Sequence, residues 1–247
     1  MEFGYKIVRS VRAQVFKTIK IPYPILVNGI RGYMSTEPVK KSRIILGRNA
    51  VCGDYVVLGE LSTKNKDLPP LRIGSNARIR SHTVIYSGNV IGDGFQTGHH
   101  VLIREKNRIG DNVSVGSFSD IGIENEIGSD VRIHSSCFIP EFVVIKDGAW
   151  LGPRVTILNI LHPPCPKFTE CAKGIVIREG AKIGGNVTIG PGVEIGKNAL
   201  VGSGSVVMKS IPDGSVAYGN PAKIAQKVRD MKCKMGYYDF PYQWQKI

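Results

Sequence analysis

The stretch IGDNVS VGSFSD IGIENE IGSDVR IHSSCF, residues 109–138, begins each block of six with an aliphatic residue. The same phase runs from Ile73 to Ile157, where fourteen of fifteen such positions are Ile, Val or Leu in a chain that is 42% apolar, and the fifteenth is Thr97. A helix repeats its apolar face about every 3.6 residues and a strand every two, so a period of six fits a short strand plus a turn. Such a period predicts a parallel β-helix, whose units bury a core only by stacking on one another.

The phase breaks twice, and each break predicts an insertion. Sixteen residues separate Val57 from Ile73, which is ten more than one step, so residues near 61–71 must leave the stack. The second insertion, residues 158–174, comes before the pattern resumes at Ile177. Insertions in repeat proteins gather on one face, which is often the binding face. The first coil is expected to point these residues inward: Ile45, Val51 and Val57.

Three segments follow from this pattern: residues 1–40, a β-helix over residues 41–210, and residues 211–247. The first contains YKIVRSVRAQVFKTIK, a basic amphipathic helix. It either caps the open end of the solenoid, which we favour, or contacts a membrane surface through residues 1–20. The last segment is predicted to hold a helix that begins at Pro221 with Asn220 as its cap, followed by the aromatic tail YYDFPYQWQKI.

Net charge, cysteine spacing and the length of apolar runs limit which classes of function fit the chain. A net charge of +13 suggests an anionic partner, but the basic residues are scattered and no nucleic-acid-binding signature is present, so nucleic acid is disfavoured. Five cysteines at irregular spacing favour reduced thiols over a disulfide framework. No run of about 18 apolar residues and no signal-peptide pattern occurs, so a cytoplasmic protein is expected, with peripheral membrane contact as an option.

The hexapeptides, the long loop and the closing string VGSGSVVMKSIPDGSVAYGNPAKI, residues 201–224, resemble the left-handed β-helix acyltransferases over about residues 43–228. The resemblance implies an all-β fold, a left-handed parallel β-helix or hexapeptide-repeat solenoid. It also implies a homotrimer with active sites between subunits and acetyl-CoA as co-substrate.

A narrower resemblance rests on RIHSSCFIP, residues 132–140, and WLGPRVTILN, residues 150–159, followed by a proline-rich loop. This order is similar to acetyltransferases that act on nucleotide-linked amino sugars for surface glycans. The chain departs from many relatives at Ile160, where they are acidic, and at His162, where they are aromatic. The implied function is N-acetylation of such a sugar. Alternatives are a sugar O-acetyltransferase, a gamma-type carbonic anhydrase and a non-catalytic scaffold.

Four residues are candidates for the chemistry. His134 replaces glycine in the column that residues 98, 116 and 152 share at a spacing of eighteen, and it is the predicted catalytic base. Asn159, at the mouth of the long loop, either positions the acceptor or caps the loop. His162 on the same loop is a second-choice base. A backbone N–H near Gly152 is the predicted oxyanion donor.

The resemblance also suggests where the coenzyme would bind. Its pantetheine arm would meet backbone groups in the late coils, and its phosphates would meet basic side chains. The candidates are Gly202, Ser203, Lys209, Asn220, Lys223 and Lys227.

No metal is expected, although two groups of residues raise the question. His82 and His100 are eighteen apart with His99 beside them, and these are more often solvent-exposed turn residues than ligands. His162, Cys165 and Cys171 offer three zinc-type ligands without an evident fourth.

Overall fold

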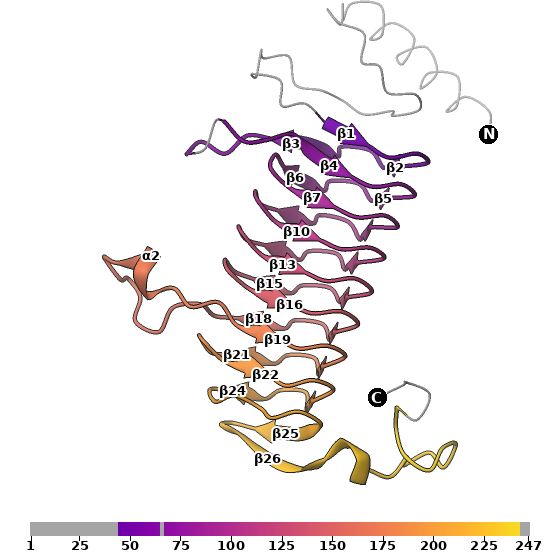
Figure 1. Ribbon diagram of the computed structural model, residues 1–247, viewed down its shortest axis with the longest axis vertical. Coiled ribbons are helices and arrows are strands. Elements are labelled where there is room, and N and C mark those ends of the chain that lie inside the picture. The colour runs from indigo at the N-terminus through magenta and orange to yellow at the C-terminus, as the bar shows by residue number, and fades with distance from the viewer. Residues whose placement is uncertain (1–43, 65–66, 243–247) are drawn as a thin grey trace, which may run out of the picture. The chain divides into compact units, whose positions relative to one another are not determined.

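The computed structural model describes residues 44–64 and 67–242, and the predicted N-terminal helix lies outside these residues (Figure 1). The chain winds through three sheets in turn, so each strand from β1 to β21 pairs in parallel with the third strand after it. This topology confirms a left-handed parallel β-helix. No described helix is long and apolar enough to cross a bilayer.

The strands of the first sheet, sheet A, are β1 (Ile44–Leu46), β4 (Leu71–Ile73), β7 (Val90–Ile91), β10 (Arg108–Ile109), β13 (Glu126–Ile127), β16 (Val144–Ile145), β19 (Val176–Ile177) and β22 (Glu194–Ile195). Those of sheet B are β2 (Val51–Cys52), β5 (Arg78–Ile79), β8 (Gln96–Thr97), β11 (Ser114–Val115), β14 (Arg132–Ile133), β17 (Trp150–Leu151), β20 (Lys182–Ile183), β23 (Leu200–Val201), β25 (Ser215–Gly219) and β26 (Ala222–Lys227). Those of sheet C are β3 (Val57–Glu60), β6 (Val84–Tyr86), β9 (Leu102–Ile103), β12 (Asp120–Ile121), β15 (Phe138–Ile139), β18 (Thr156–Ile157), β21 (Thr188–Ile189) and β24 (Val206–Val207).

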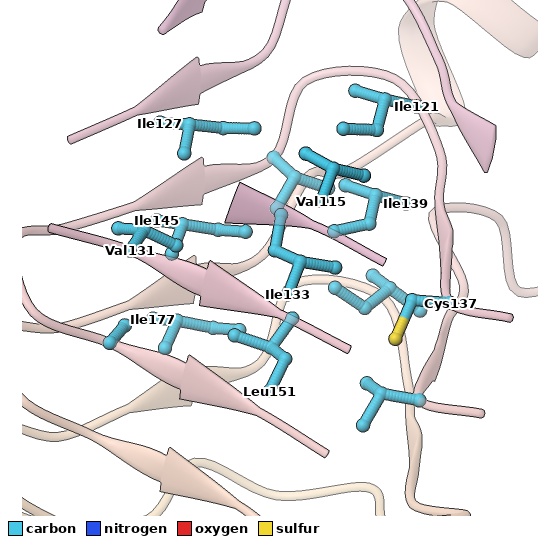
Figure 2. Packing of buried hydrophobic residues seen from close by; sticks show 14 of the residues in the cluster. Val115, Ile121, Ile127, Val131, Ile133, Cys137, Ile139, Ile145, Leu151 and Ile177 are labelled. Carbon is cyan, nitrogen blue, oxygen red and sulfur yellow. The ribbon is translucent and has the colours of Figure 1, made fainter. Parts of the chain in front are cut away.

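The core is a stack of the aliphatic residues that the six-residue phase predicts. Val115, Ile133 and Leu151 are in register on successive strands of sheet B, and each is at most 2% exposed (Figure 2). Burying one such side chain contributes about 1.5–3 kcal/mol. Thr97 is also buried, and its hydroxyl accepts the N–H of Arg80 at 2.9 Å. The polar exception in the repeat is therefore satisfied by hydrogen bonding.

The corners of the coil hold the successive turns close together. At Gly116 an added Cβ would lie 2.4 Å from the nitrogen of Ser135 in the next coil. Glycine is needed there because the next backbone occupies the space of a side chain. The corner geometry is thus set by close stacking as well as by turn conformation.

The predicted phase of the first coil is wrong by one residue. In the structure Leu46, Cys52 and Leu58 pack against the core, whereas Val51 is 58% exposed. The pairing of Cys52 with Ile79 and of Leu58 with Ile85 sets this phase. Both neighbouring positions are apolar in this coil, so periodicity could not choose between them, and a shift of one residue exchanges the faces of a strand.

Both predicted insertions leave the stack. The first follows β3 and ends at β4. The second carries the short helix α2 (Phe168–Cys171) and projects from the coils between β18 and β19 (Figure 1). Where the loop leaves and rejoins the coils, the N–H of Lys173 donates to the carbonyl of Asn159 at 2.7 Å. This hydrogen bond joins the two ends of the long loop, and we call this point its neck.

The predicted helix at Pro221 is wrong. β26 folds back on β25 as an antiparallel hairpin, and β25 itself pairs in parallel with β23, so sheet B continues past the last predicted coil. A 3-10 turn, η1 (Val228–Asp230), follows β26. Pairing with the open edge of β25 provides backbone hydrogen-bond partners for β26. Asn220 consequently lies in the hairpin connection and caps no helix.

Candidate active site

His134 follows β14 at the corner between sheets B and C. The register places it between Gly116 and Gly152, as the eighteen-residue spacing predicts, and its N–H donates to the carbonyl of Leu151 at 2.9 Å. Its ring is tilted against the Trp150 ring, with centroids 4.7 Å apart. The backbone and this ring contact fix the position of the imidazole.

The electrostatic setting of His134 favours its neutral form. Burial lowers the pKa of His134, and the positive charge of Arg132 lowers it further. The Nε2 atom is buried and has no hydrogen-bond partner among the described residues. A neutral imidazole with an uncommitted nitrogen can accept a proton, which is the property of a general base.

Beside His134, the outward face of sheet B carries residues that the sequence analysis did not single out. Arg132, Trp150 and Lys182 are in register on three successive strands. Lys182 is 9% exposed, its Nζ donates to the carbonyl of Gly180 at 2.7 Å, and it lies 4.5 Å from the ring centroid of Tyr242. Burial lowers the pKa of Lys182. The C-terminal tail thus folds over this face. The eighteen-residue spacing of the sequence predicts that Trp150 lies next to Arg132, but it gives no sign of the contact with the tail.

The N–H of Gly152 takes part in the ladder between coils, where it donates to the carbonyl of Ile183 at 2.8 Å. A donor that is committed to a backbone hydrogen bond is aimed at a developing oxyanion only when that bond breaks. The oxyanion donor near Gly152 stays a prediction.

Asn159 is 7% exposed and is held by two interactions at the neck of the long loop. Its Nδ2 donates to Oε2 of Glu141 at 2.7 Å, and its carbonyl accepts the N–H of Lys173. The backbone of Asn159 thus joins the two ends of the loop, whereas its side chain binds the Glu141 carboxylate. Asn159 follows sheet C whereas His134 follows sheet B, so one chain places the two residues at different corners of the coil. Glu141 was not predicted, although it precedes Asn159 by eighteen residues, the spacing that brings residues of adjacent coils together.

His162 is exposed on the long loop beyond Asn159. On the same loop the Sγ atoms of Cys165 and Cys171 are 3.0 Å apart. Within residues 44–64 and 67–242, no group of three His, Cys, Asp or Glu side chains is arranged to hold a metal ion. His162 therefore does not complete a zinc site with the two cysteines in one described chain.

Two of the predicted coenzyme contacts are already engaged in the structure. The N–H of Gly202 donates to the carbonyl of Ala217 at 2.8 Å, and its role toward the pantetheine amides stays a prediction. The Nζ of Lys227 donates to the Asp213 carbonyl at 3.3 Å and to the Ser215 hydroxyl at 3.1 Å. Lys227 therefore supports the hairpin.

The remaining predicted contacts are exposed in the last coils. Ser203 follows β23, and Lys209 follows β24. Lys223 is on β26 opposite Tyr218, and Asn220 lies in the connection that precedes this strand. Exposed lysines at one end of the solenoid remain compatible with binding a phosphate.

The histidines at positions 82 and 100 stack as their spacing predicts. Their ring centroids are 4.5 Å apart, and the stack continues to Tyr55 above and to Phe118 below. His99 lies beside them, with Nδ1 2.8 Å from the Ser81 hydroxyl. These exposed rings contact each other face to face, so they form an aromatic column on the corner.

Comparison with known proteins places this repeat in a family. Residues 174–209 match the family model described as bacterial transferase hexapeptide (six repeats). The matched segment lies in the last coils of the solenoid. The chain is 36% identical over 96 residues to galactoside O-acetyltransferase of Lactococcus lactis, covering 37% of this chain and 46% of the relative. It is 35% identical over 115 residues to serine acetyltransferase of Buchnera aphidicola, covering 40% of each chain.

Solved structures give a further likeness. A mutant of GDP-perosamine N-acetyl transferase from Caulobacter crescentus, in complex with CoA and GDP-perosamine, aligns with a TM-score of 0.41 at 23% identity, covering 59% of this chain and 57% of that one. The matches span less than half the length of these two curated relatives.

Proposed function

We propose that the protein is an acetyl-CoA-dependent N-acetyltransferase that acts on the amine of a nucleotide-linked amino sugar. The observation that carries the proposal is the environment of His134. Its surroundings favour the neutral form, its ring contacts Trp150, and its buried Nε2 has no hydrogen-bond partner among the described residues. The family match at residues 174–209 and the acetyltransferase names of the sequence relatives support the reaction class.

In the proposed reaction the sugar amine attacks the thioester carbonyl of acetyl-CoA. The new C–N bond forms as the C–S bond breaks, and His134 Nε2 accepts the proton that the nitrogen loses, directly or through water. The coenzyme leaves as its thiolate and is then protonated. A neutral imidazole suits this proton transfer, and because Nε2 is buried in the described chain, the amine or a bridging water must first gain access to it.

We propose that the working form is a cytoplasmic homotrimer with its sites between subunits. The placement of His134 and Asn159 at different corners of one chain supports this, since a site using both residues would draw them from two chains. The exposed Lys209 and Lys223 supply positive charge for the phosphates of the coenzyme or the nucleotide.

A sugar O-acetyltransferase is the second candidate, favoured by the match to galactoside O-acetyltransferase. A hydroxyl is a much weaker nucleophile than a free amine, so this reaction depends on the base. His134 would then be essential, whereas an amine acceptor would retain part of its rate without it.

The deciding experiment measures thiol release from acetyl-CoA with UDP-, dTDP- and GDP-linked amino sugars and with matched hydroxyl sugars. We expect release with an amino sugar and not with its hydroxyl counterpart. His134→Ala should reduce the rate, by about 10²–10⁴-fold if the acceptor is a hydroxyl, and His162→Ala tests the second-choice base in the same assay. Release with hydroxyl sugars alone would establish the second candidate. Failure to bind acetyl-CoA in calorimetry would refute both.

A further inference from the structure

The long loop holds two thiols that the proposed reaction does not use. Cys165 is half-buried and Cys171 is exposed at the end of α2. The turn of α2 places Cys171 by a hydrogen bond from its N–H to the carbonyl of Lys167 at 2.9 Å. This turn folds the chain back, so residues six apart in sequence bring their side chains together.

The two sulfur atoms are 3.0 Å apart, within hydrogen-bond reach. In a disulfide the two sulfur atoms are about 2.0 Å apart, so the two side chains must bring their sulfur atoms closer before the bond can form. The hydrogen bond with Cys165 raises the pKa of the Cys171 thiol, so the pair rests in its protonated form and exchange proceeds through the minor thiolate form. The exposure of Cys171 gives a small reagent access to the pair.

The other three thiols are less exposed than Cys171. Burial raises the pKa of Cys52 and of Cys137, and Cys137 is enclosed in the core. Backbone hydrogen bonds lower the pKa of Cys233. Cys233 therefore serves as a reactive single-thiol control.

We propose that Cys165 and Cys171 are a reversible modification site that forms a disulfide within the loop by exchange with a low-molecular-weight disulfide such as oxidised glutathione. One thiolate attacks the reagent, forming a mixed disulfide and releasing one thiol. The second cysteine, as its thiolate, then attacks the sulfur of the first cysteine in this mixed disulfide and releases the other thiol of the reagent. Two protein thiols are oxidised, and one reagent disulfide is reduced to two thiols.

The new bond would close a ring of seven residues, 165–171, beside the tied neck of the loop. The neck itself is held by the hydrogen bond from Lys173 to Asn159, and the N–H of Gly192 donates to the carbonyl of Lys173 at 3.3 Å. Oxidation would therefore restrict the outer part of the loop while leaving its attachment to the coils unchanged.

The test equilibrates the full-length protein with glutathione buffers of increasing oxidation, then alkylates the free thiols and digests with trypsin. With the protein denatured for alkylation, all five cysteines should react after reducing conditions. After oxidising conditions Cys165 and Cys171 should be lost together from the alkylated set, while Cys233 is either alkylated or carries one glutathione. Trypsin cleaves after Lys167, between the two cysteines, so the oxidised loop should yield two peptides that remain joined until a reductant is added. In Cys165→Ser, Cys171 should carry one glutathione instead.

Three results would overturn the proposal: five alkylated cysteines at every buffer ratio, a linkage to Cys233, or thiols that resist alkylation until a chelator removes bound zinc. Cys233→Ser provides the matched control and should leave the joined peptides in place. Urea unfolding of both serine variants checks that the fold is retained. This test is independent of the proposed acetyl transfer.

Discussion

A ladder of buried asparagines at the corner between sheets C and A allows a quantitative prediction. The Oδ1 atoms of Asn89, Asn107 and Asn125 each accept a backbone N–H from the next coil, at 2.8, 2.9 and 2.8 Å, and the last of these donors is Val143. The Nδ2 of Asn107 donates to the carbonyl of Arg104 at 2.7 Å. The Nδ2 of Asn125 has no hydrogen-bond partner among the described residues. The side chain of Asn107 therefore makes one more hydrogen bond than that of Asn125.

The substitution Asn107→Ala should lower the free energy of unfolding by about 2–4 kcal/mol. It leaves the buried N–H of Asn125 without an acceptor, at about 1–3 kcal/mol, and removes the hydrogen bond to Arg104, at about 0.5–1.5 kcal/mol. The Arg104 carbonyl keeps a second donor, Asn89 Nδ2 at 2.7 Å, so it adds no further cost. Asn125→Ala also leaves one N–H, that of Val143, without an acceptor. It removes an unpartnered buried amide nitrogen of similar cost at the same time, so the expected loss in the free energy of unfolding is about 0–2 kcal/mol.

Urea unfolding followed by circular dichroism would measure these differences, with all variants at one protein concentration because association shifts apparent stability. Lys106→Ala is the control: its ion pair with Glu124 is exposed, so a change within about 0.5 kcal/mol is expected. An Asn125→Ala loss equal to or greater than that of Asn107→Ala would refute the assignment of the ladder.

Two further predictions test the core and the candidate base. Ile133→Ala should lose about 2–5 kcal/mol of stability, whereas Arg132→Ala, which removes the adjacent exposed side chain, should change it by about 0.5 kcal/mol or less; equal losses in urea unfolding would contradict the inward and outward alternation. Activity that needs neutral His134 should fall as pH drops through its pKa, and burial and Arg132 place that pKa below the ordinary value of about 6.5. In Arg132→Gln the acid limb of kcat/KM should move to higher pH, and an unchanged limb would show that His134 is not the titrating base.

Sequence analysis located much of the candidate site but not its hydrogen bonds. The eighteen-residue spacing put His134 in a column of glycines and stacked His82 on His100, and the structure confirms both. It could not show that the N–H groups of Gly152 and Gly202 are committed to the ladder between coils. Which backbone donors remain free depends on neighbouring coils and on the added strand β25, and neither is visible in a local motif.

The sequence by itself determined the solenoid, its six-residue repeat and the two insertions, because each coil repeats the same local requirement for one inward aliphatic residue and a tight turn. The tertiary structure alone decided the phase of the first coil, where Val51 and Cys52 are both apolar and pairing with the next coil selects one of them. It also decided that the segment at Pro221 forms a strand, and that Trp150 packs on His134. These outcomes depend on contacts between residues far apart in the chain, where pairing to an open sheet edge and burial outweigh local preference.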